Sequence, residues 1–490
     1  MTGDQGDALT GQLVGGGDGL FSDDLIATVL SGPLSISAAQ FRYSTDGFRD
    51  NADQDIELYD LFVHWRLTPD TSVQAEARRR RDERGDIGLY PFDDVDSQTL
   101  RHFRDRDTYR LGLRHDWQPG HSTLVSVQRE RLQEGQDFEL ELMLPFGPPV
   151  PIVLPFEVRA ELRPLLAEAQ QVISGDPGRL LMGGGYYRAN GDIDVNGFML
   201  DQRVRQHNGY AYGYVDGADG MQWTLGVAVD SVEADAIDKT RVSPKLGLVW
   251  ALDRHTTLRA AALRAVHREL IGKGTIEPAQ VSGFVQFFDD PVGTRSDRYA
   301  LGIDRRLRDG LDVGLEASWR QLERPYLDLL SGAQSGDARQ QLHRVYAYWT
   351  PAPRWAVRGE YRYQKETYSD DFPLIVETGN WGIFDLRTHS LPLGVRYSDP
   401  SGWLADVAVT GYHQSGDFVV TTSNQQRQAT DTFWLSDVRV GYRLPRRSGL
   451  VSVGVRNLFD TEVQFQDTDP QNPQLHPQRH LYASVSLMLD

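Results

Sequence analysis

Apolar and polar residues alternate at every second position through most of this chain, and that period constrains its fold more than any other feature. In segment 449–456, for example, Val451, Val453 and Val455 alternate with Ser452, Gly454 and Arg456. Successive side chains of a β-strand point to opposite faces, so such a strand has one apolar and one polar side. A sheet built from such strands either packs on a core or faces lipid.

Charged residues occupy the polar side in three segments of the C-terminal half, 311–320, 355–364 and 434–444. A soluble core cannot accept charges at every second position, so we expect this side to line a water-filled lumen. The expected lumen-lining residues are Arg320, Arg358, Glu360, Arg362, Asp437, Arg439 and Arg443. The residues expected to face lipid are Trp319, Val357, Tyr361, Val438, Val440 and Val453.

Short links rich in turn residues, such as 308–310 and 399–401, alternate with long links along the chain. The sequence therefore predicts an all-β fold, a transmembrane antiparallel up-and-down β-barrel with short periplasmic turns and long outer loops. We expect about 20 strands, within a range of roughly 18 to 22. The barrel is expected over 34–490, after a largely irregular lead-in over 1–33.

One stretch disturbs the regular alternation of links, the long loop insertion expected near 133–178. Short and long links continue to alternate only if this stretch contains a strand. The candidate for that strand is 155–162, whereas 164–169 looks helical. The proline-rich piece 145–151 is too apolar for bulk water. We expect it to fold into the lumen or cap the mouth, or else to meet an external partner or the membrane.

Composition agrees with a bacterial outer-membrane location. Cysteine is absent, which suits an oxidising compartment, and 10 Trp, 20 Tyr and 19 Phe can supply aromatic girdles at the membrane interfaces. The net charge of −18 argues against nucleic acid as a partner. The first residues, Met1 to Asp7, lack the basic and apolar regions of a signal peptide.

One motif has the spacing of a calcium loop. Asp192, Asp194 and Asn196 precede Gly197 as D-x-D-x-N-G, but Arg203 stands where such a loop has a bidentate Glu. The alternatives are a structural calcium site and an acidic hairpin loop. We expect no other cofactor.

A second motif is the run of four arginines at 78–81. On a strand, Arg78 and Arg80 would line the lumen, while Arg79 and Arg81 would reach the headgroup zone, where lipopolysaccharide phosphate is a candidate ligand. No nucleophile elbow, zinc-protease motif or Walker motif is present, so we expect a protein that is not an enzyme.

The segment 241–250, read as Arg-Val-Ser-Pro-Lys-Leu-Gly-Leu-Val-Trp, resembles a barrel segment of TonB-dependent outer-membrane receptors. The segments 257–262 and 455–462, and Pro477 with Arg479, extend this resemblance over about half of the chain, 241–490. It implies a receptor-like barrel, although the family's N-terminal plug and energy-coupling box do not appear in this sequence.

The resemblance implies passage of a solute or polymer across the outer membrane. One alternative is an export conduit that works with a periplasmic partner domain, and another is a surface adhesin or assembly anchor. The expected partners are outer-membrane lipid, lipopolysaccharide and a periplasmic partner or coupling protein.

Overall fold

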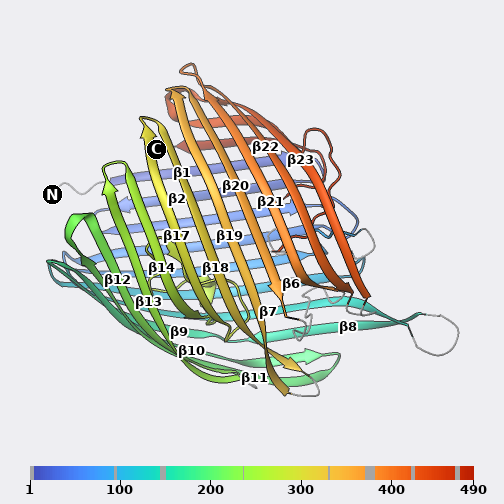
Figure 1. Cartoon of the computed structure of the whole chain (residues 1–490), viewed down its shortest axis with the longest axis horizontal. Coiled ribbons are helices and arrows are strands. Elements are labelled where there is room, and N and C mark those ends of the chain that lie inside the picture. Colours follow the sequence, from blue (N-terminus) through green and yellow to red (C-terminus); the bar gives the residue numbers. More distant parts are fainter. Residues whose placement is uncertain are drawn as a thin grey trace.

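One closed antiparallel sheet forms the wall of the molecule in the computed structural model (Figure 1). The structure describes residues 5–92, 96–143, 151–234, 237–328, 332–369, 381–420, 425–468 and 475–489. Almost every strand of the wall pairs with the next along the chain, and the last strand pairs with the first, from Leu9 opposite Leu489 to Gly16 opposite Tyr482. This pairing closes the barrel.

The wall has 22 strands, with β8 and β9 together occupying one strand position. Its strands are β1 (Gln5–Gly16), β2 (Phe21–Ser31), β3 (Leu34–Thr45), β4 (Gln54–Thr68), β5 (Thr71–Arg84), β6 (Arg101–Gln118), β7 (His121–Met143), β8 (Pro151–Leu162), β9 (Leu165–Gly175), β10 (Gly178–Val195), β11 (Phe198–Asp216), β12 (Met221–Ala234), β13 (Ile237–Asp253), β14 (Thr256–Val266), β17 (Arg295–Arg308), β18 (Leu311–Asp328), β19 (Gly332–Ala352), β20 (Trp355–Tyr368), β21 (Trp381–Ser398), β22 (Trp403–Val420), β23 (Gln425–Arg443), β24 (Gly449–Arg456) and β25 (His480–Leu489). The expected count of about 20 is close to this number.

Two of the strands lie where an irregular lead-in was expected over 1–33, and that expectation is wrong for the described part. β1 and β2 pair along their whole length, from Gln5 opposite Ser31 to Gly15 opposite Phe21. Glycines at 11 and 15 share the outward face of β1 with Leu9 and Leu13. That face therefore carries few large apolar residues, and its alternation is hard to detect in the sequence.

In the described part of 133–178, where a loop insertion was expected, almost every residue belongs to a strand, so that expectation is also wrong there. The candidate strand 155–162 is correct and belongs to β8, but the segment that looked helical is β9. Leu166, Glu168 and Gln170 alternate with Ala167 and Ala169 on opposite faces of β9. Pairing with β7 and β10 outweighs the good helix propensity of these residues.

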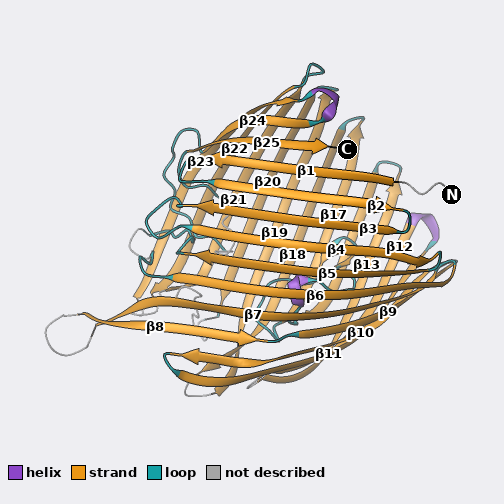
Figure 2. Cartoon of the chain, turned by 180° about the vertical axis from the view of Figure 1, so that it is seen from behind, coloured by secondary structure: helices purple, strands orange, loops and turns teal. Residues whose placement is uncertain are grey.

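Pro164 separates β8 from β9, because a proline has no N–H to donate to a neighbouring strand. Its carbonyl still accepts a hydrogen bond from the Glu130 N–H at 3.0 Å, so the wall stays connected there. On the N-terminal side of Val158, β8 pairs only with β7. There the two strands form a ribbon that projects from the rim of the barrel (Figures 1 and 2).

The outer face of the wall is an apolar belt. Trp319, Tyr361, Val440 and Val453 are exposed on it, and Val357 and Val438 lie on the same face because they pair with exposed apolar residues of the adjoining strands. Ring contacts mark both margins of the belt. Near the short turns these are Trp355–Tyr397 (centroids 4.8 Å apart) and Trp403–Tyr442 (5.2 Å), and near the long loops Trp319–His343 (5.0 Å) and His343–Tyr363 (5.8 Å).

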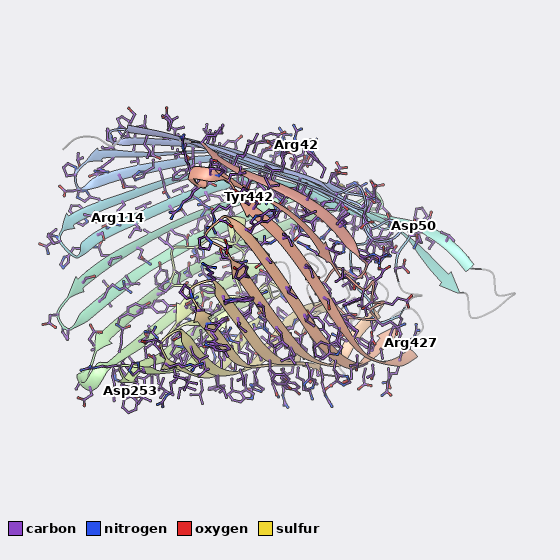
Figure 3. All side chains as sticks on the ribbon, turned by 90° about the horizontal axis from the view of Figure 1, so that it is seen from above. Arg42, Asp50, Arg114, Asp253, Arg427 and Tyr442 are labelled. Carbon is purple, nitrogen blue, oxygen red and sulfur yellow. The ribbon has the colours of Figure 1, made fainter. Side chains whose placement is uncertain are left out.

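The two ends of the barrel differ. Arg114 and Asp253 mark the end with the short turns, and Asp50 and Arg427 mark the end with the long loops (Figure 3). A closed barrel with this belt and these girdles is an outer-membrane protein, and the bacterial outer membrane is its location. Among the described residues, no helix is long and apolar enough to cross a membrane.

Candidate functional site

The connection between β14 and β17, residues 267–294, folds into the barrel and forms the candidate site. We call it the inner loop. It contains a short 3-10 helix (η2, Ile271–Lys273) and a small hairpin of β15 (Gln280–Val281) and β16 (Phe284–Val285). Its side chains and backbone carbonyls contact strands from β9 to β18. A single loop can reach all of these strands only across the concave side of the sheet, and Figure 2 shows η2 within the outline of the barrel.

Apolar side chains hold the hairpin of the inner loop against the wall. Val281 and Phe284 are fully buried in a cluster with Tyr212 and Leu263 from the wall. Gly247 makes this approach possible, since a Cβ at that position would overlap the Ser282 hydroxyl. At the other end of the loop, Ile271 packs in a second cluster of the wall, made up of Leu166, Tyr187, Ala189 and Val204.

A buried ion network ties the middle of the inner loop to β11 and β12. Arg268 lies 3.1 Å from Asp230 and 2.5 Å from Glu277, and all three side chains are at most 5% exposed. The Tyr212 hydroxyl donates to Glu277 at 2.7 Å, and the Asn208 amide donates to the same carboxylate at 3.2 Å. Buried charges are stable only when they are paired and hydrogen-bonded in this way.

Polar contacts also fasten the inner loop to β9. The Gln170 amide donates to the Ile276 carbonyl at 2.7 Å, and the Ile276 N–H donates to Glu168 at 3.3 Å. The Thr275 hydroxyl donates to the same Glu168 carboxylate.

The far end of the inner loop is fastened to β17 and β18. Arg320 pairs with Asp290 at 2.5 Å and lies over the Phe288 ring, 3.6 Å from its centroid. Arg298 donates to the Val285 carbonyl at 2.5 Å. The loop is therefore held at several points on a wide arc of the inner wall.

Two titratable groups of the inner loop have perturbed pKa values. Burial raises the pKa of Glu269, and the nearby Glu134 adds to the effect, while Arg106 opposes it. Burial lowers the pKa of His267, and Asp290 partly opposes this. Both shifts arise because docking removes these groups from water.

A second set of loops packs over the inner face of β22 and β23. Phe465 and Leu475, from the connection between β24 and β25, are buried with Leu89, Phe433 and Leu435. The Gln466 N–H donates to the Gln414 side chain of β22 at 2.7 Å. The Asp467 N–H donates to the Leu89 carbonyl at 3.2 Å, which links this connection to the one between β5 and β6.

The seven residues expected in the lumen all lie on the inner face of their strands, the face opposite to that of Trp319, Tyr361 and Val440. Arg320 alone belongs to the inner-loop site, where it is buried. The other six lie on β20 and β23. There Arg362 pairs with Glu360 at 2.5 Å, and Arg439 pairs with Asp406 at 2.6 Å.

The four consecutive arginines divide between the two faces of β5. Arg78 pairs on the inner side with Asp60 at 2.8 Å, and Arg80 pairs there with Asp82 at 2.9 Å. Arg79 and Arg81 lie on the outer face beyond the apolar belt, each more than two-fifths exposed.

The D-x-D-x-N-G motif forms the tip of the hairpin between β10 and β11. Asp194 accepts the Gly197 N–H at 2.6 Å, and Asn196 accepts the Glu157 N–H at 2.7 Å. Their side chains thus stabilise the turn and its contact with β8. Among the described residues, no group of three or more His, Cys, Asp or Glu side chains is placed to hold a metal ion.

Sequence reasoning missed the inward path of the inner loop, because the link 268–296 was expected to be one of the long outer loops. Three phenylalanines, Phe284, Phe287 and Phe288, within a few residues of each other in a loop were the available signal. The expected inward-folding segment, 145–151, lies outside the described residues except for Pro151, which begins β8.

Comparison with known proteins identifies the fold. The structure of the receptor FpvA of P. aeruginosa, bound to heterologous pyoverdines, matches with a TM-score of 0.75 at 14% identity, over 99% of this chain and 72% of that chain. The copper transporter OprC matches with 0.72 at 14% identity, over 100% and 81%. The ferric citrate transporter FecA matches with 0.71 at 14% identity, over 99% and 79%.

No protein-family model matches this chain, and no curated protein matches it by sequence. At these identities the structural matches establish the fold, which is the barrel of the TonB-dependent receptors.

Proposed function

We propose that this barrel passes a solute across the outer membrane and that the inner loop, 267–294, is the movable gate of its lumen. The inner loop itself supports this proposal most directly. Side chains of the wall alone cannot fill a barrel much wider than about eight strands, so some other segment must control passage. Here that segment is fixed to the wall by side-chain contacts rather than by ladder pairing.

The nature of these contacts suits a gate. Moving a wall strand would break many ladder hydrogen bonds, whereas releasing the inner loop breaks a few ion pairs and hydrogen bonds and exposes the apolar contacts of Ile271, Val281 and Phe284. Paired charges along the remaining inner wall, such as Arg344 with Glu316 at 3.0 Å, give a solute a polar path. Fold relatives named as transporters of copper and ferric citrate agree with this role.

Deletion of the inner loop tests the proposal. We replace residues 275–290 with a short Gly-Ser linker and record conductance in planar bilayers and solute uptake by liposomes. The variant should conduct several-fold more than the wild-type protein. A correctly inserted variant that conducts and takes up solute no more than the wild-type protein would contradict the proposal and leave the barrel as an anchor.

A matched control is available within the same loop. Lys273 and Asp289 form an exposed ion pair, each side chain 68% exposed, that makes none of the wall contacts described above. The double variant K273A/D289A should leave conductance and uptake unchanged. An increase in this variant as large as that of the deletion would also count against the proposed gate.

A further inference from the structure

One row of side chains on the inner wall of β3 to β6 is apolar at one end and basic at the other. Phe41 of β3 lies opposite Leu58 of β4, which lies opposite Arg80 of β5, which lies opposite Arg106 of β6. These four strands are neighbours in the wall (Figure 2). Side chains directly opposite each other on one face of a sheet have Cβ atoms about 5 Å apart. A single ligand can therefore contact both ends of the row.

The apolar end of this row belongs to a set of six residues of β2, β3 and β4 that face the lumen. Asp60 of β4 pairs with Arg78 on the inner side, so the alternate residues of β4 before and after Asp60 also face inward. Strand register places residues of β2 and β3 beside them. At about 3.3 Å per residue, the set extends roughly 20 Å along β4. We call it the apolar patch: Ile26, Ala39, Phe41, Ile56, Leu58 and Phe62.

The described loops pack on other parts of the inner wall. Apolar side chains on the inner faces of β10 to β17 are buried against the inner loop, and those of β22 and β23 against the connection between β24 and β25. The patch residues belong to none of the buried apolar clusters that the described residues form, and Ile26 is 38% exposed. Apolar surface left in water is unfavourable, so the patch favours an apolar ligand.

Arg106, at the basic end of the row, has a guanidinium group available to a ligand. Its Nε atom is buried without a hydrogen-bond partner, and no ion pair joins Arg106 to another described residue. The carboxylates on either side of it on β7 have other partners, because Glu130 accepts the Thr108 hydroxyl at 2.9 Å and Glu134 pairs with Arg104 at 2.7 Å. A negatively charged group of a ligand would complete this site.

The other charges of the row set the charge and the orientation of the ligand. Arg80 is paired with Asp82 at 2.9 Å, so the two guanidinium groups together match a ligand with a single negative charge. At the opposite end Asp24 lies opposite Phe41 and would repel an anion. The anionic head must therefore lie at β5 and β6, with the apolar part on β2 to β4.

We propose that the apolar patch, Arg80 and Arg106 together bind an amphipathic monocarboxylate, a molecule with an alkyl chain and one carboxylate, near the outer mouth of the lumen. Guanidinium groups bind carboxylate through paired N–H donors, and the patch removes the chain from water. Arg106 also attracts Glu269 of the inner loop, so a carboxylate bound at Arg106 weakens docking of that loop. That this ligand is the transported solute rests on the proposed function.

The test measures binding to the intact barrel, held in an amphiphilic polymer, by isothermal titration calorimetry. The probes are decanoate, uncharged decanamide and acetate. The wild-type protein should bind decanoate about tenfold more tightly than either of the other two, each of which lacks one part of the ligand. The variant R80Q/R106Q should bind decanoate about tenfold more weakly than the wild-type protein, a loss of about 1.4 kcal/mol. L58S/F62S should also bind it more weakly, because the chain loses its apolar contact.

The control R306Q/R358Q removes two exposed arginines from the inner faces of β17 and β20, and it should bind decanoate as the wild-type protein does. Equal loss in both arginine variants, unchanged binding in R80Q/R106Q, or equal affinity for decanoate and decanamide would overturn the proposal. If R80Q/R106Q does not fold, the single variants R80Q and L58S replace it, and unchanged binding in both would likewise refute the site.

The same assay separates this site from the gate. The barrel in which a linker replaces 275–290 keeps every residue of the site, so it should bind decanoate at least as well as the wild-type protein. Decanoate binding in a barrel whose conductance does not respond to that replacement would support the site and contradict the gate. A replacement that raises conductance in a barrel that binds no decanoate would refute the site alone.

Discussion

A single side chain in this wall faces either lipid or the lumen, and that orientation decides what a substitution costs. Val440 of β23 is 45% exposed on the outer face, and Val407 and Val453 lie on the same apolar face. We expect V440R to destabilise the folded barrel by roughly 1–2 kcal/mol, because an arginine there is placed in hydrocarbon, but near the Trp403–Tyr442 margin of the belt rather than at the midplane. Urea unfolding in lipid vesicles measures this loss.

The matched control is A408R on the inner face of β22. Ala408 lies opposite Asp437, so the new guanidinium has a carboxylate and the lumen within reach. We expect a change in unfolding free energy of less than about 1 kcal/mol. Equal destabilisation by both variants would show that the assignment of faces is wrong.

Glu269 makes docking of the inner loop depend on pH. Its pKa is higher in the docked state than in water, so the docked state binds the proton more tightly and docking weakens as pH rises above the ordinary pKa of a glutamate. E269Q should therefore strengthen docking at pH 8 and change it little at pH 4. Hydrogen exchange of residues 275–290, measured at both pH values, tests this.

His267 acts in the opposite direction, because its pKa is lowered by docking and its protonation weakens docking as pH falls through the ordinary range of a histidine. The comparison of E269Q with the wild-type protein cancels this contribution, since both contain His267. Identical exchange in the two proteins at pH 8 would rule out Glu269 as a source of the pH dependence.

At the scale of elements, the inner loop can be fixed to the wall by a single engineered bond. A Cβ at Gly247 would lie 3.1 Å from the Ser282 Cβ and 2.8 Å from the Val281 Cγ1. The hairpin must therefore shift outward slightly for a bridge to reach the usual disulfide Cβ separation of about 3.8 Å. The chain contains no cysteine, so no other intramolecular bridge can form in G247C/S282C. We expect the oxidised protein to lose channel openings induced by urea and to regain them with dithiothreitol.

The control for this bridge is T28C/S37C, whose parent hydroxyls lie 2.9 Å apart on the inner faces of β2 and β3, outside the inner-loop site. Oxidation of this pair should leave the openings unchanged. Openings that persist after the 247–282 bridge has formed would show that solute passes without movement of the hairpin.

Elements with strict alternation could be predicted from sequence, and elements that depend on distant neighbours could not. β18, β20 and β23 alternate charged and apolar residues so regularly that both faces follow from period two. β9 has helix-favouring residues and is a strand only because β7 and β10 flank it. β1 carries glycines where a lipid-facing strand usually carries apolar side chains.

The candidate site was predictable only in part, for a similar reason. Inner-face residues such as Arg320 follow from the strand period, but their partner Asp290 lies in a loop whose path has no periodic signal. The inner loop is directed inward by complementarity with Tyr212, Asp230 and Gly247, residues of other strands. Such complementarity exists only once the wall is formed.

At the scale of the whole molecule, the seam between β1 and β25 affects how the barrel can be made. The two strands that complete the wall are the first and the last strands of that wall, with Leu9 opposite Leu489. Until β25 arrives, the sheet has two unpaired edges that would aggregate in water and cannot be tolerated in lipid. Biogenesis must therefore shield a nearly complete sheet until the final strand is delivered, and a defect in β25 would affect every earlier strand.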